Sequence, residues 1–373
     1  MSRSRRNAHA QRPLRIGMVA PPWFELPPTG YGGIEAVVAD LVEQLVRRGH
    51  EIHLVAAGPA RTAAQYHYAS YDRPPSQRLG EAFPEVVHAA YAADVLADLD
   101  VDVVHDHSLA GALLARGRTT PTLVTMHGPG SGDYGRIVRL LGSTIRLVAI
   151  SDAQRAMSPG LPWIDRVHNG LDVDTYPLVT AKDDYLLWLG RFTRDKGPHL
   201  AIDVARAAGR RIVLAGKLIE PEERAFFRDE VEPRLGPDAE YVGEADASRK
   251  RELFSRARCL LFPLQWDEPF GIVMAEAMAC GTPVAALRRG SVPEVVEHGV
   301  SGFVVDTLDE LRAAVDKCDD LDPHACRDLA RERFDLATMA DGYERAYRAV
   351  LAGRPVAVGS LAGSLPRREA MSA

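Results

Sequence analysis

The sequence predicts an α/β protein made of two doubly wound, Rossmann-like parallel-sheet domains that face each other across a cleft. Short apolar or β-branched runs alternate with longer segments of helical periodicity, which is typical of parallel sheets covered by helices on both faces. The alternation stops in a polar, turn-rich segment at 169–184 and then restarts. The length of 373 residues fits two domains with an appendage, at about 150 residues per domain.

The expected elements follow from this alternation. In the first half, strands are expected at 15–20, 51–56, 101–105, 122–126 and 147–150, and helices at 34–48, 84–99 and 151–157. In the second half, strands are expected at 185–190, 211–215, 240–242, 259–262 and 282–285. Its helices are expected at 196–208, 221–235, 247–257, 271–279, 308–317 and 323–333. Ser151 is expected to cap the helix that follows it.

The same alternation sets the predicted domain boundaries. A disordered basic tail is expected at 1–13 and a second disordered tail at 353–373. The N-terminal domain is predicted to span 14–170, and the C-terminal domain 171–335. A last helix at 336–352 follows the second domain, and we expect it to cross back to the first.

Composition excludes several classes of protein. The formal net charge of −6 argues against a nucleic-acid-binding protein, which needs a positive surface. Four scattered cysteines form no Cys-x-x-Cys pair, which argues against a disulfide scaffold and a zinc site. The basic N-terminal segment has no apolar core behind it, and no window approaches a membrane span. A cytoplasmic location is therefore expected.

Ligands of open parallel sheets bind beyond the carboxyl ends of the strands, so the loops after strands are examined for chemistry. The first such loop, PPWFELPPTGYGG, leads into a predicted helix. Gly32 and Gly33 at its end let the backbone approach a phosphate, and the helix N-terminus favours an anion. An ordinary glycine turn is the alternative. Trp23, Phe24 and Tyr31 in this loop suggest stacking on a sugar ring or an apolar scaffold.

The loop GRFTRDKG follows the first strand of the second half. We expect Arg191 and Lys196 of this loop to converge on one polyanion. Lys196 is predicted to start a helix, where a cation opposes the helix macrodipole unless an anion binds beside it. The alternative is a pair of solvated surface cations.

The segment DEPFGIVMAEAMACGTPV is the most specific motif in the chain. Glu268 precedes a helix that is predicted to open at Gly271, and Glu276 lies on the same edge, one turn deeper. The backbone N–H groups of Phe270, Gly271 and Ile272 are unpaired at this helix start, so they can bind a phosphate while the two carboxylates reach hydroxyl groups. Small and apolar neighbours crowd Glu276, and a buried carboxylate needs hydrogen bonds, which argues against two merely exposed carboxylates.

Histidines end two of the predicted strands. His127 closes one, and His105 and His107 close another, so all three are expected near the cleft. A structural role is the alternative for a histidine at a strand end. Metal binding by the His-Asp-His run is disfavoured because adjacent strand residues point to opposite faces. The Asp-x-Asp pairs at 100–102 and 172–174 are expected to be structural, so no metal site is predicted.

These motifs together resemble the retaining glycosyltransferases of family 4, which have the GT-B fold of two Rossmann-like domains. The resemblance spans 14–351 and rests on GYGG, on GRFTRDKG and on the Glu-x7-Glu pattern inside EPFGIVMAEAMACGTPV. The runs VVHDH and HNGLD also look like signatures of the family. The resemblance implies a hexosyltransferase that needs neither a bound metal nor a cofactor.

The resemblance implies that a nucleotide-sugar donor binds mainly to the second domain. Arg191 and Lys196 would bind its diphosphate and contribute to catalysis. Glu276 would bind the ribose hydroxyls. Glu268, a further catalytic candidate, would hold the donor sugar and diphosphate together with the backbone of 270–272.

On the first domain, Gly33 beside Gly32 would approach the diphosphate. His127 matches a strand-end histidine that lies near the donor sugar and the acceptor hydroxyl, and it is a catalytic candidate. The residues assigned to the acceptor side are Trp23, Phe24, Tyr31 and His105.

The predicted function is transfer of a sugar to an acceptor hydroxyl with retention, by a front-face route in which the departing diphosphate deprotonates the acceptor. UDP is the expected donor nucleotide and GDP the next, on base rates. The acceptor class is left open between a sugar, a lipid and another small molecule. Two alternatives stay open: a sugar-nucleotide epimerase or hydrolase on the same fold, and a non-catalytic partner subunit that binds a nucleotide sugar.

A weak basic amphipathic pattern also raises the hypothesis of peripheral membrane contact. Its basic members are Arg136, Arg139 and Arg146, and its apolar members are Ile137, Val138, Leu140 and Leu141. The basic N-terminal tail would add attraction to such a surface. A solvated helix face is the alternative.

Overall fold

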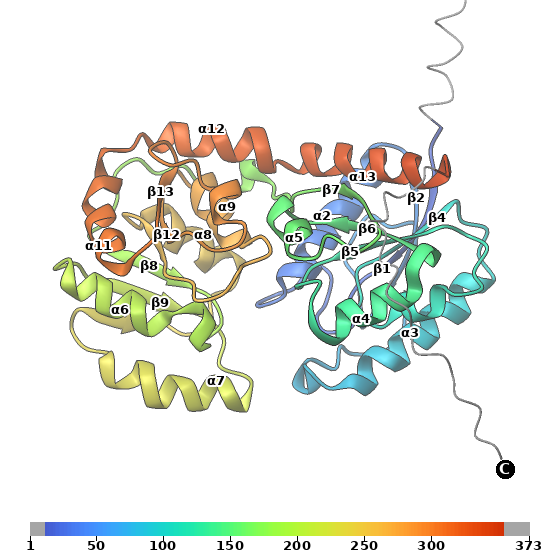
Figure 1. Ribbon diagram of the computed structural model, residues 1–373, viewed down its shortest axis with the longest axis horizontal. Coiled ribbons are helices and arrows are strands. Elements are labelled where there is room, and N and C mark those ends of the chain that lie inside the picture. The colour runs from blue at the N-terminus through green and yellow to red at the C-terminus, as the bar shows by residue number, and fades with distance from the viewer. Residues whose placement is uncertain (1–11, 354–373) are drawn as a thin grey trace, which may run out of the picture.

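The computed structural model describes residues 12–353, which form two α/β units (Figure 1). The N-terminal unit holds a seven-stranded sheet of order β3-β2-β1-β4-β5-β6-β7, and the C-terminal unit holds a six-stranded sheet of order β10-β9-β8-β11-β12-β13. Neighbouring strands pair in parallel in both sheets. The predicted doubly wound α/β fold is therefore confirmed. The predicted tails lie outside the described residues, apart from residues 12, 13 and 353.

The N-terminal unit places its site loops after the central strands. Its strands are β1 (Arg15–Val19), β2 (Glu51–Ala56), β3 (Tyr66–Ala69), β4 (Val103–Asp106), β5 (Thr122–Met126), β6 (Ile145–Ala149) and β7 (Trp163–Arg166). Its helices are α2 (Gly33–Arg47), α3 (Ala82–Ala97), α4 (Gly132–Leu141) and α5 (Asp152–Met157), with short 3-10 turns η1 (Ser76–Arg78), η2 (Gly111–Ala115) and η3 (Gly142–Thr144). The Ser151 hydroxyl accepts the Gln154 N–H at 2.9 Å, so the predicted cap of α5 is confirmed.

The C-terminal unit repeats this alternation around a second core. Its strands are β8 (Leu186–Leu189), β9 (Ile212–Ala215), β10 (Ala239–Tyr241), β11 (Leu260–Phe262), β12 (Val284–Leu287) and β13 (Gly302–Val305). Its helices are α6 (Pro198–Ala207), α7 (Pro221–Phe226), α8 (Ala247–Arg256), α9 (Ile272–Ala279), α10 (Val292–Val295), α11 (Leu308–Lys317) and α12 (Pro323–Phe334). Short turns include η4 (Val173–Thr175), η5 (Arg194–Lys196) and η8 (Cys318–Asp320).

The helix expected at 221–235 is not continuous, which corrects the prediction. It ends as α7 at Phe226, passes through a π-helical turn, η6 (Phe227–Val231), and finishes as a 3-10 turn, η7 (Glu232–Arg234). Pro233 lies in that last turn and has no N–H to continue the α-helical pattern.

The last helix, α13 (Leu336–Leu351), packs on the N-terminal sheet, whereas α12 before it covers the C-terminal unit (Figure 1). Tyr343 and Tyr347 of α13 are fully buried in the N-terminal core. The chain thus crosses between the units twice, after β7 and again at Asp335. The two crossings touch, because the Leu171 N–H donates to the Phe334 carbonyl at 2.9 Å.

The structure also describes the state of the cysteines and the character of the helices. All four cysteines are free and buried, so none takes part in a disulfide. A search of residues 12–353 finds no helix of the length and apolarity that crossing a membrane requires.

Candidate active site

The loop before α9 positions Glu268 beside Lys196. Glu268 is buried and pairs with the Lys196 ammonium group, which also lies 4.7 Å from the centre of the Trp266 ring. Gly271 has a φ of 70°, a left-handed conformation that suits glycine, and it caps the start of α9. A side chain at Gly290 would meet the Glu268 backbone at 2.3 Å, so only glycine lets that loop close over Glu268.

Lys196 is not the start of an α-helix, which corrects the prediction. It ends the 3-10 turn η5, and α6 begins after Gly197. Gly197 is left-handed with a φ of 69°, and a Cβ there would lie 2.4 Å from the Pro263 carbonyl oxygen. The turn therefore fits tightly against the chain after β11 and presents Lys196 to Glu268.

Glu276 lies one turn and more into α9, where its neighbours are buried and apolar. Its Oε1 accepts the Tyr176 hydroxyl at 3.0 Å and the Lys250 ammonium at 2.8 Å. Its Oε2 is buried and has no hydrogen-bond partner among residues 12–353. A buried carboxylate oxygen without a partner is costly, which indicates that a hydrogen-bond donor from outside the protein completes this site.

Arg191 is held by carboxylates of its own domain. Its Nε donates to Glu223 at 2.8 Å, and its guanidinium also pairs with Glu220. Burial raises the pKa of Glu223, but hydrogen bonds from Arg191 and from backbone N–H groups outweigh this effect and hold that pKa below its usual value. The structure therefore gives Arg191 and Lys196 separate carboxylate partners, and no single protein group joins them within the described residues.

The loop at 21–33, called the glycine loop below, extends from the N-terminal unit to the C-terminal unit. The Tyr31 N–H donates to Glu244 at 2.9 Å, and the Lys217 ammonium lies 4.7 Å from the centre of the Tyr31 ring. Lys217 is fully buried and pairs with Glu220, the partner of Arg191. A Cβ at Gly33 would have open space around it, so the first backbone turn of α2 is accessible.

Two of the acceptor-side predictions are wrong. Trp23 is buried, and its indole N–H donates to Glu85 at 2.8 Å, so its ring is part of the core and not a stacking surface. His105 is fully buried, with its ring nitrogens at 2.8 Å from the Tyr347 hydroxyl and 2.8 Å from the Thr125 hydroxyl. Both of its nitrogens are thus used inside the fold.

His127 is paired with His107, which was expected near the cleft but was given no role in the site. Its Nε2 lies 2.9 Å from His107 Nδ1. The outer nitrogens, His127 Nδ1 and His107 Nε2, are buried and unpartnered in the described part of the chain. Burial lowers the pKa of His127 to about 4 and the pKa of His107 well below its usual value, so both rings are neutral near pH 7. The pairing could have been predicted from the sequence, because each histidine follows the end of a strand and the two strands are neighbours.

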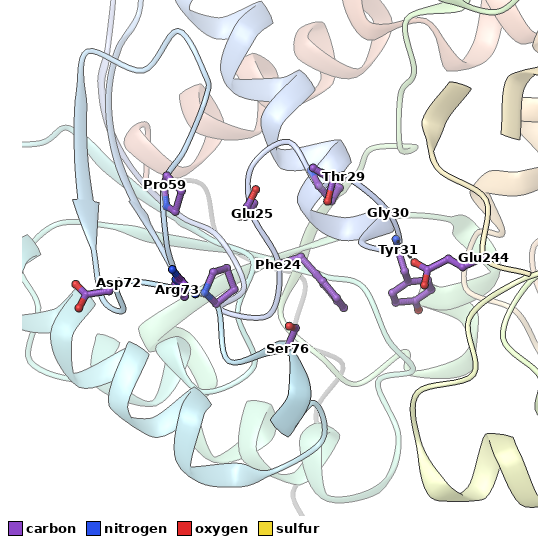
Figure 2. Close-up of a pocket in the computed structure, with 12 residues that line it drawn as sticks. Phe24, Glu25, Thr29, Gly30, Tyr31, Pro59, Asp72, Arg73, Ser76 and Glu244 are labelled. Atoms are coloured by element: carbon purple, nitrogen blue, oxygen red, sulfur yellow. Dashed lines mark hydrogen bonds between the residues drawn. The ribbon is translucent and has the colours of Figure 1, made fainter. Parts of the chain in front are cut away.

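A pocket of about 560 Å³ opens beside the glycine loop (Figure 2). Phe24 and Tyr31 line it from the loop after β1, and their rings pack edge to face at 5.6 Å. Ser76 comes from η1, and Glu244 comes from the other unit. The pocket therefore lies where loops of both units meet, and it contains the two acceptor-side candidates whose side chains are accessible.

The aspartate pairs at 100–102 and 172–174 contact other parts of the protein. Asp102 accepts the Arg15 N–H at 2.8 Å, and Asp100 pairs with the Arg15 guanidinium at 2.6 Å. Asp172 caps the turn η4, and Asp174 pairs with Arg331 at 2.7 Å. Residues 12–353 contain no group of three or more side chains that could hold a metal ion.

Comparisons with known proteins show which family the chain is similar to. Residues 31–175 match the family model "Glycosyltransferase Family 4", and residues 177–330 match "Glycosyl transferases group 1". The chain is 28% identical to the phosphatidyl-myo-inositol mannosyltransferase of Mycobacterium tuberculosis, over 87% of this chain and 91% of that protein. It is 26% identical to the glycogen synthase of the same organism, over 91% of this chain and 96% of that protein.

Solved structures with a similar fold include the following two. A glycosyltransferase involved in avilamycin A biosynthesis has a TM-score of 0.67 and 28% identity, covering 91% of this chain and 99% of that one. The HepE protein of Anabaena, solved in complex with UDP-glucose, has a TM-score of 0.70 and 17% identity, covering 91% and 100%.

Proposed function

Because this chain belongs to glycosyltransferase family 4 and has the GT-B fold, we propose that it transfers a sugar from a nucleoside-diphosphate sugar to an acceptor hydroxyl. Its membership of the family makes it a transferase enzyme. The donor, the stereochemistry and the independence from metal are the proposed parts. The observation that carries the proposal is Glu276, whose buried Oε2 has no partner in the described residues while Oε1 is fully engaged.

Glu276 is proposed to bind the ribose of the donor nucleotide. A ribose hydroxyl donates the hydrogen bond that the free oxygen lacks. Tyr176 and Lys250 hold the other oxygen, so the carboxylate has a fixed orientation before the ligand arrives. UDP is proposed as the first nucleotide and GDP as the second. UDP is placed first because HepE, which has a similar fold, was solved with UDP-glucose.

Lys196 and Arg191 are proposed to bind the diphosphate by exchanging their carboxylate partners for it. Glu268 now neutralises Lys196, and Glu220 and Glu223 neutralise Arg191. The first-turn N–H groups of α9 have no partners within the helix and add a further anion-binding element. Negative charge grows on the diphosphate as the sugar leaves, so cations aimed at it stabilise the transition state.

The proposed reaction is a front-face displacement with retention. The bond between the anomeric carbon and the diphosphate oxygen breaks, and its electron pair leaves with the diphosphate. The acceptor oxygen bonds to the same face of that carbon, and its proton passes to the departing diphosphate oxygen. His127 is neutral because burial lowers its pKa to about 4, so it would serve as a hydrogen-bonding group for the sugar rather than as a charge. The step as written needs no metal ion.

The pocket beside the glycine loop is proposed as the acceptor site. Phe24 and Tyr31 supply aromatic surface, and Ser76 and Glu244 supply polar groups, a combination that is typical of sites for hydroxylated ligands. Because Glu244 comes from the C-terminal unit, the pocket is complete only when the two units are together.

Thermal unfolding with UDP, GDP, ADP and dTDP tests the donor site. A nucleotide at about a hundred times its dissociation constant adds roughly 2.7 kcal/mol to the stability, which raises Tm by a few degrees. We expect one nucleotide to stabilise the wild type but not Lys196→Ala. Stabilisation by none of them, at millimolar ligand, contradicts the proposed donor site.

The anomeric configuration of the product, measured by NMR with the donor so identified, tests the stereochemistry. Retention is expected, and inversion contradicts the front-face step. Free sugar or an epimerised donor formed without any acceptor identifies the hydrolase or epimerase alternative instead.

A further inference from the structure

Seven of the eleven large apolar side chains that are exposed within residues 12–353 gather on one side of the N-terminal unit. We call this surface the α3–η2 face, and its members are Phe83, Val86, Val87, Leu109, Leu113, Leu114 and Leu140. The turn η2 contacts both α3 and α4, and the two helices lie on the same side of the sheet (Figure 1). These side chains therefore belong to one surface.

The helix α3 is apolar on two sides. Its inner side buries Ala92 and Leu96 in the N-terminal unit. Its outer side presents Phe83, which is 74% exposed, and Val87 one turn later. A helix that is apolar all round is normally buried on all sides, so the outer side of α3 lacks a partner.

The turn η2 reverses the usual order of burial. Ala112 and Ala115 face the core and are almost completely buried, whereas Leu113 and Leu114 are 44% and 43% exposed. Leucine is the more apolar residue and is normally the one inside. Two leucines at the surface of one short turn thus extend the apolar face from α3 toward α4.

The α3 edge of this face is acidic. Asp94 and Asp98 follow Val87 at seven and eleven residues, a spacing that keeps them on the same outer side of the helix, and both are exposed. No arginine or lysine occurs between residues 81 and 106. The charge on this edge is therefore negative.

The α4 edge of the face is basic. Arg116 and Arg139 are exposed, and the Arg116 guanidinium donates to the Leu140 carbonyl at 3.1 Å, which places its charge beside α4. Residues 109–146 carry five arginines and one aspartate. The exposed leucines thus lie between a negative edge and a positive edge.

The topology places the two edges at the same level of the molecule. The helix α3 leads into β4 and α4 leads into β6, and these strands run parallel in the sheet order β4-β5-β6. Both helices therefore end toward the same edge of the sheet, with Asp94 near the end of α3 and Arg139 in the last turn of α4. The turn η2, which connects β4 to β5, lies between them.

The four charges that define the two edges form no ion pair with another side chain of residues 12–353. Charges beside them do, because Glu81 pairs with Arg78 at 2.8 Å and Arg136 pairs with Asp133 at 3.4 Å. Charges without a partner in their own chain are available to opposite charges on another molecule.

From these observations we infer that the α3–η2 face binds the same face of a second copy of the chain. In a dimer whose two-fold axis runs along η2, the acidic edge of each copy meets the basic edge of the other, and the leucines of both copies pack at the centre. A face of one charge sign would repel its own copy. The two opposite edges make this face complementary to itself, which favours a second copy over a partner of one charge sign.

The basic amphipathic helix expected from the sequence is corrected by the structure. Val138 and Leu141 of α4 are buried, and Ile137 is half-buried in the core beneath the helix. The helix α4 therefore adds only Leu140 and its arginines to the surface, and the apolar centre comes from α3 and η2. The whole face belongs to the N-terminal unit, so the inferred dimer does not rest on the proposed function.

Sedimentation velocity of the full-length chain over a range of concentrations tests the inference. We expect a reversible dimer for the wild type. The double variant L113S/L114S removes four leucines from the dimer and is expected to raise its Kd at least about tenfold. The matched control is Leu308→Ser, an exposed leucine on α11 of the other unit, which is expected to dimerise as the wild type does. Unchanged thermal unfolding shows that both variants fold.

Two charge-reversal variants test the symmetry of the contact. In D94R/D98R alone, and in R116E/R139E alone, like charges meet at both edges, so each variant is expected to dimerise about tenfold more weakly than the wild type. In an equimolar mixture of the two, every edge contact joins opposite charges. We therefore expect the mixture to form a heterodimer about as strong as the wild-type dimer, measured with one variant carrying a fluorescent label.

Three results overturn the inference: a wild type that is monomeric at about 100 μM, a dimer that L113S/L114S leaves unchanged, and a mixture of the charge variants that stays as weak as each alone. A monomeric wild type that binds anionic vesicles through Leu113 and Leu114 would assign the face to a lipid surface instead. Nucleotide stabilisation of each variant is measured in parallel and is expected to equal that of the wild type. Failure of dimerisation is thereby distinguished from failure of the proposed function.

Discussion

The two faces of the candidate site differ in how they carry charge. On the C-terminal unit, Lys196 and Arg191 each have a carboxylate partner. On the N-terminal unit, His107 and His127 bond to each other, and burial lowers the pKa of each. One face is therefore made of ion pairs, and the other of neutral rings.

The difference indicates a division of tasks. A buried charge without a partner is strongly unfavourable, so cations that are kept for a ligand need a protein carboxylate while the ligand is absent. A neutral face carries no such cost and suits the uncharged sugar and acceptor. The following predictions test this contrast, from the largest expected effect to the smallest.

Removing one cation from the charged face is expected to have the largest effect. Lys196→Met is predicted to lower kcat/KM about a hundred- to a thousandfold, or roughly 2.7–4 kcal/mol, because a contact to the developing diphosphate charge is lost. The control is Arg194→Ala, which changes an exposed arginine in the same turn. Steady-state kinetics with the donor measures both. Equal loss in the two variants would show that general charge, and not the ion pair with Glu268, matters.

Glu276→Gln sharpens the role of the free carboxylate oxygen. The glutamine keeps an oxygen for Tyr176 and Lys250 but places a donor where an acceptor stood. A hydrogen bond to a charged group contributes about 1.5–3 kcal/mol, so Kd for the nucleotide should rise about ten- to a hundredfold. Calorimetry with UDP and its 2′-deoxy analogue measures this. The wild type should prefer UDP, and a variant that keeps the preference contradicts ribose binding by Glu276.

Acidification tests the buried histidine behind the histidine face, His105, whose ring lies 4.1 Å from the His107 ring. Burial lowers the pKa of His105 to about 3, below the usual 6.5, so the folded protein binds fewer protons than the unfolded chain between these values. Stability is therefore complete above pH 6.5 and falls as the pH drops, by about 2 kcal/mol for this group between pH 7 and 5.

His105→Gln removes that titration and keeps hydrogen-bonding atoms for Tyr347 and Thr125. Denaturant unfolding at pH 7 and 5 should show a smaller loss for the variant, by about 2 kcal/mol. His324→Gln, an exposed histidine on α12, is the control and should follow the wild type. An identical pH dependence of His105→Gln and the wild type would mean that the buried His105 becomes charged without cost.

The smallest expected effect distinguishes Trp23, a core residue, from Phe24, a residue of the pocket. Trp23→Phe deprives the buried Glu85 of one hydrogen bond and should cost about 1 kcal/mol of stability with no change in the acceptor KM. Phe24→Ala, in the adjacent position, should raise the acceptor KM instead. A raised acceptor KM in Trp23→Phe would return that ring to the acceptor site.

The central strands were predictable from sequence, whereas three of the four edge strands were not; the fourth, β10, was expected at 240–242. The predicted runs at 15–20, 51–56 and 122–126 became β1, β2 and β5, whose residues are almost all buried. The strands β3, β7 and β13 were missed. All three lie at sheet edges, and in β3 and β7 polar side chains interrupt the continuous apolar run. The strand β13 has an apolar run and was missed all the same.

In the site, local motifs were predictable and long-range partners were not. The placement of Glu268 and Glu276 around the start of α9 follows from spacing within one segment. The pairing of Arg191 with Glu223 joins the loop after β8 to α7, which follows the neighbouring strand β9, and no local pattern encodes it. Trp23 and His105 were assigned to the acceptor by residue type, but their burial depends on α3 and α13, which come much later in the chain.

The return of the chain onto the N-terminal unit limits how the two halves can move. Two covalent connections pass between them side by side, at Leu171 and at Phe334, and a backbone hydrogen bond of 2.9 Å joins them. Gly170 is packed so closely that a Cβ would lie 2.9 Å from Met339. The backbone at this junction is therefore in tight contact with α13. Adjacent, joined connections of this kind resist sliding and separation and leave rotation about a single axis. The mouth of the cleft can then widen while the spacing of the halves at the junction stays constant.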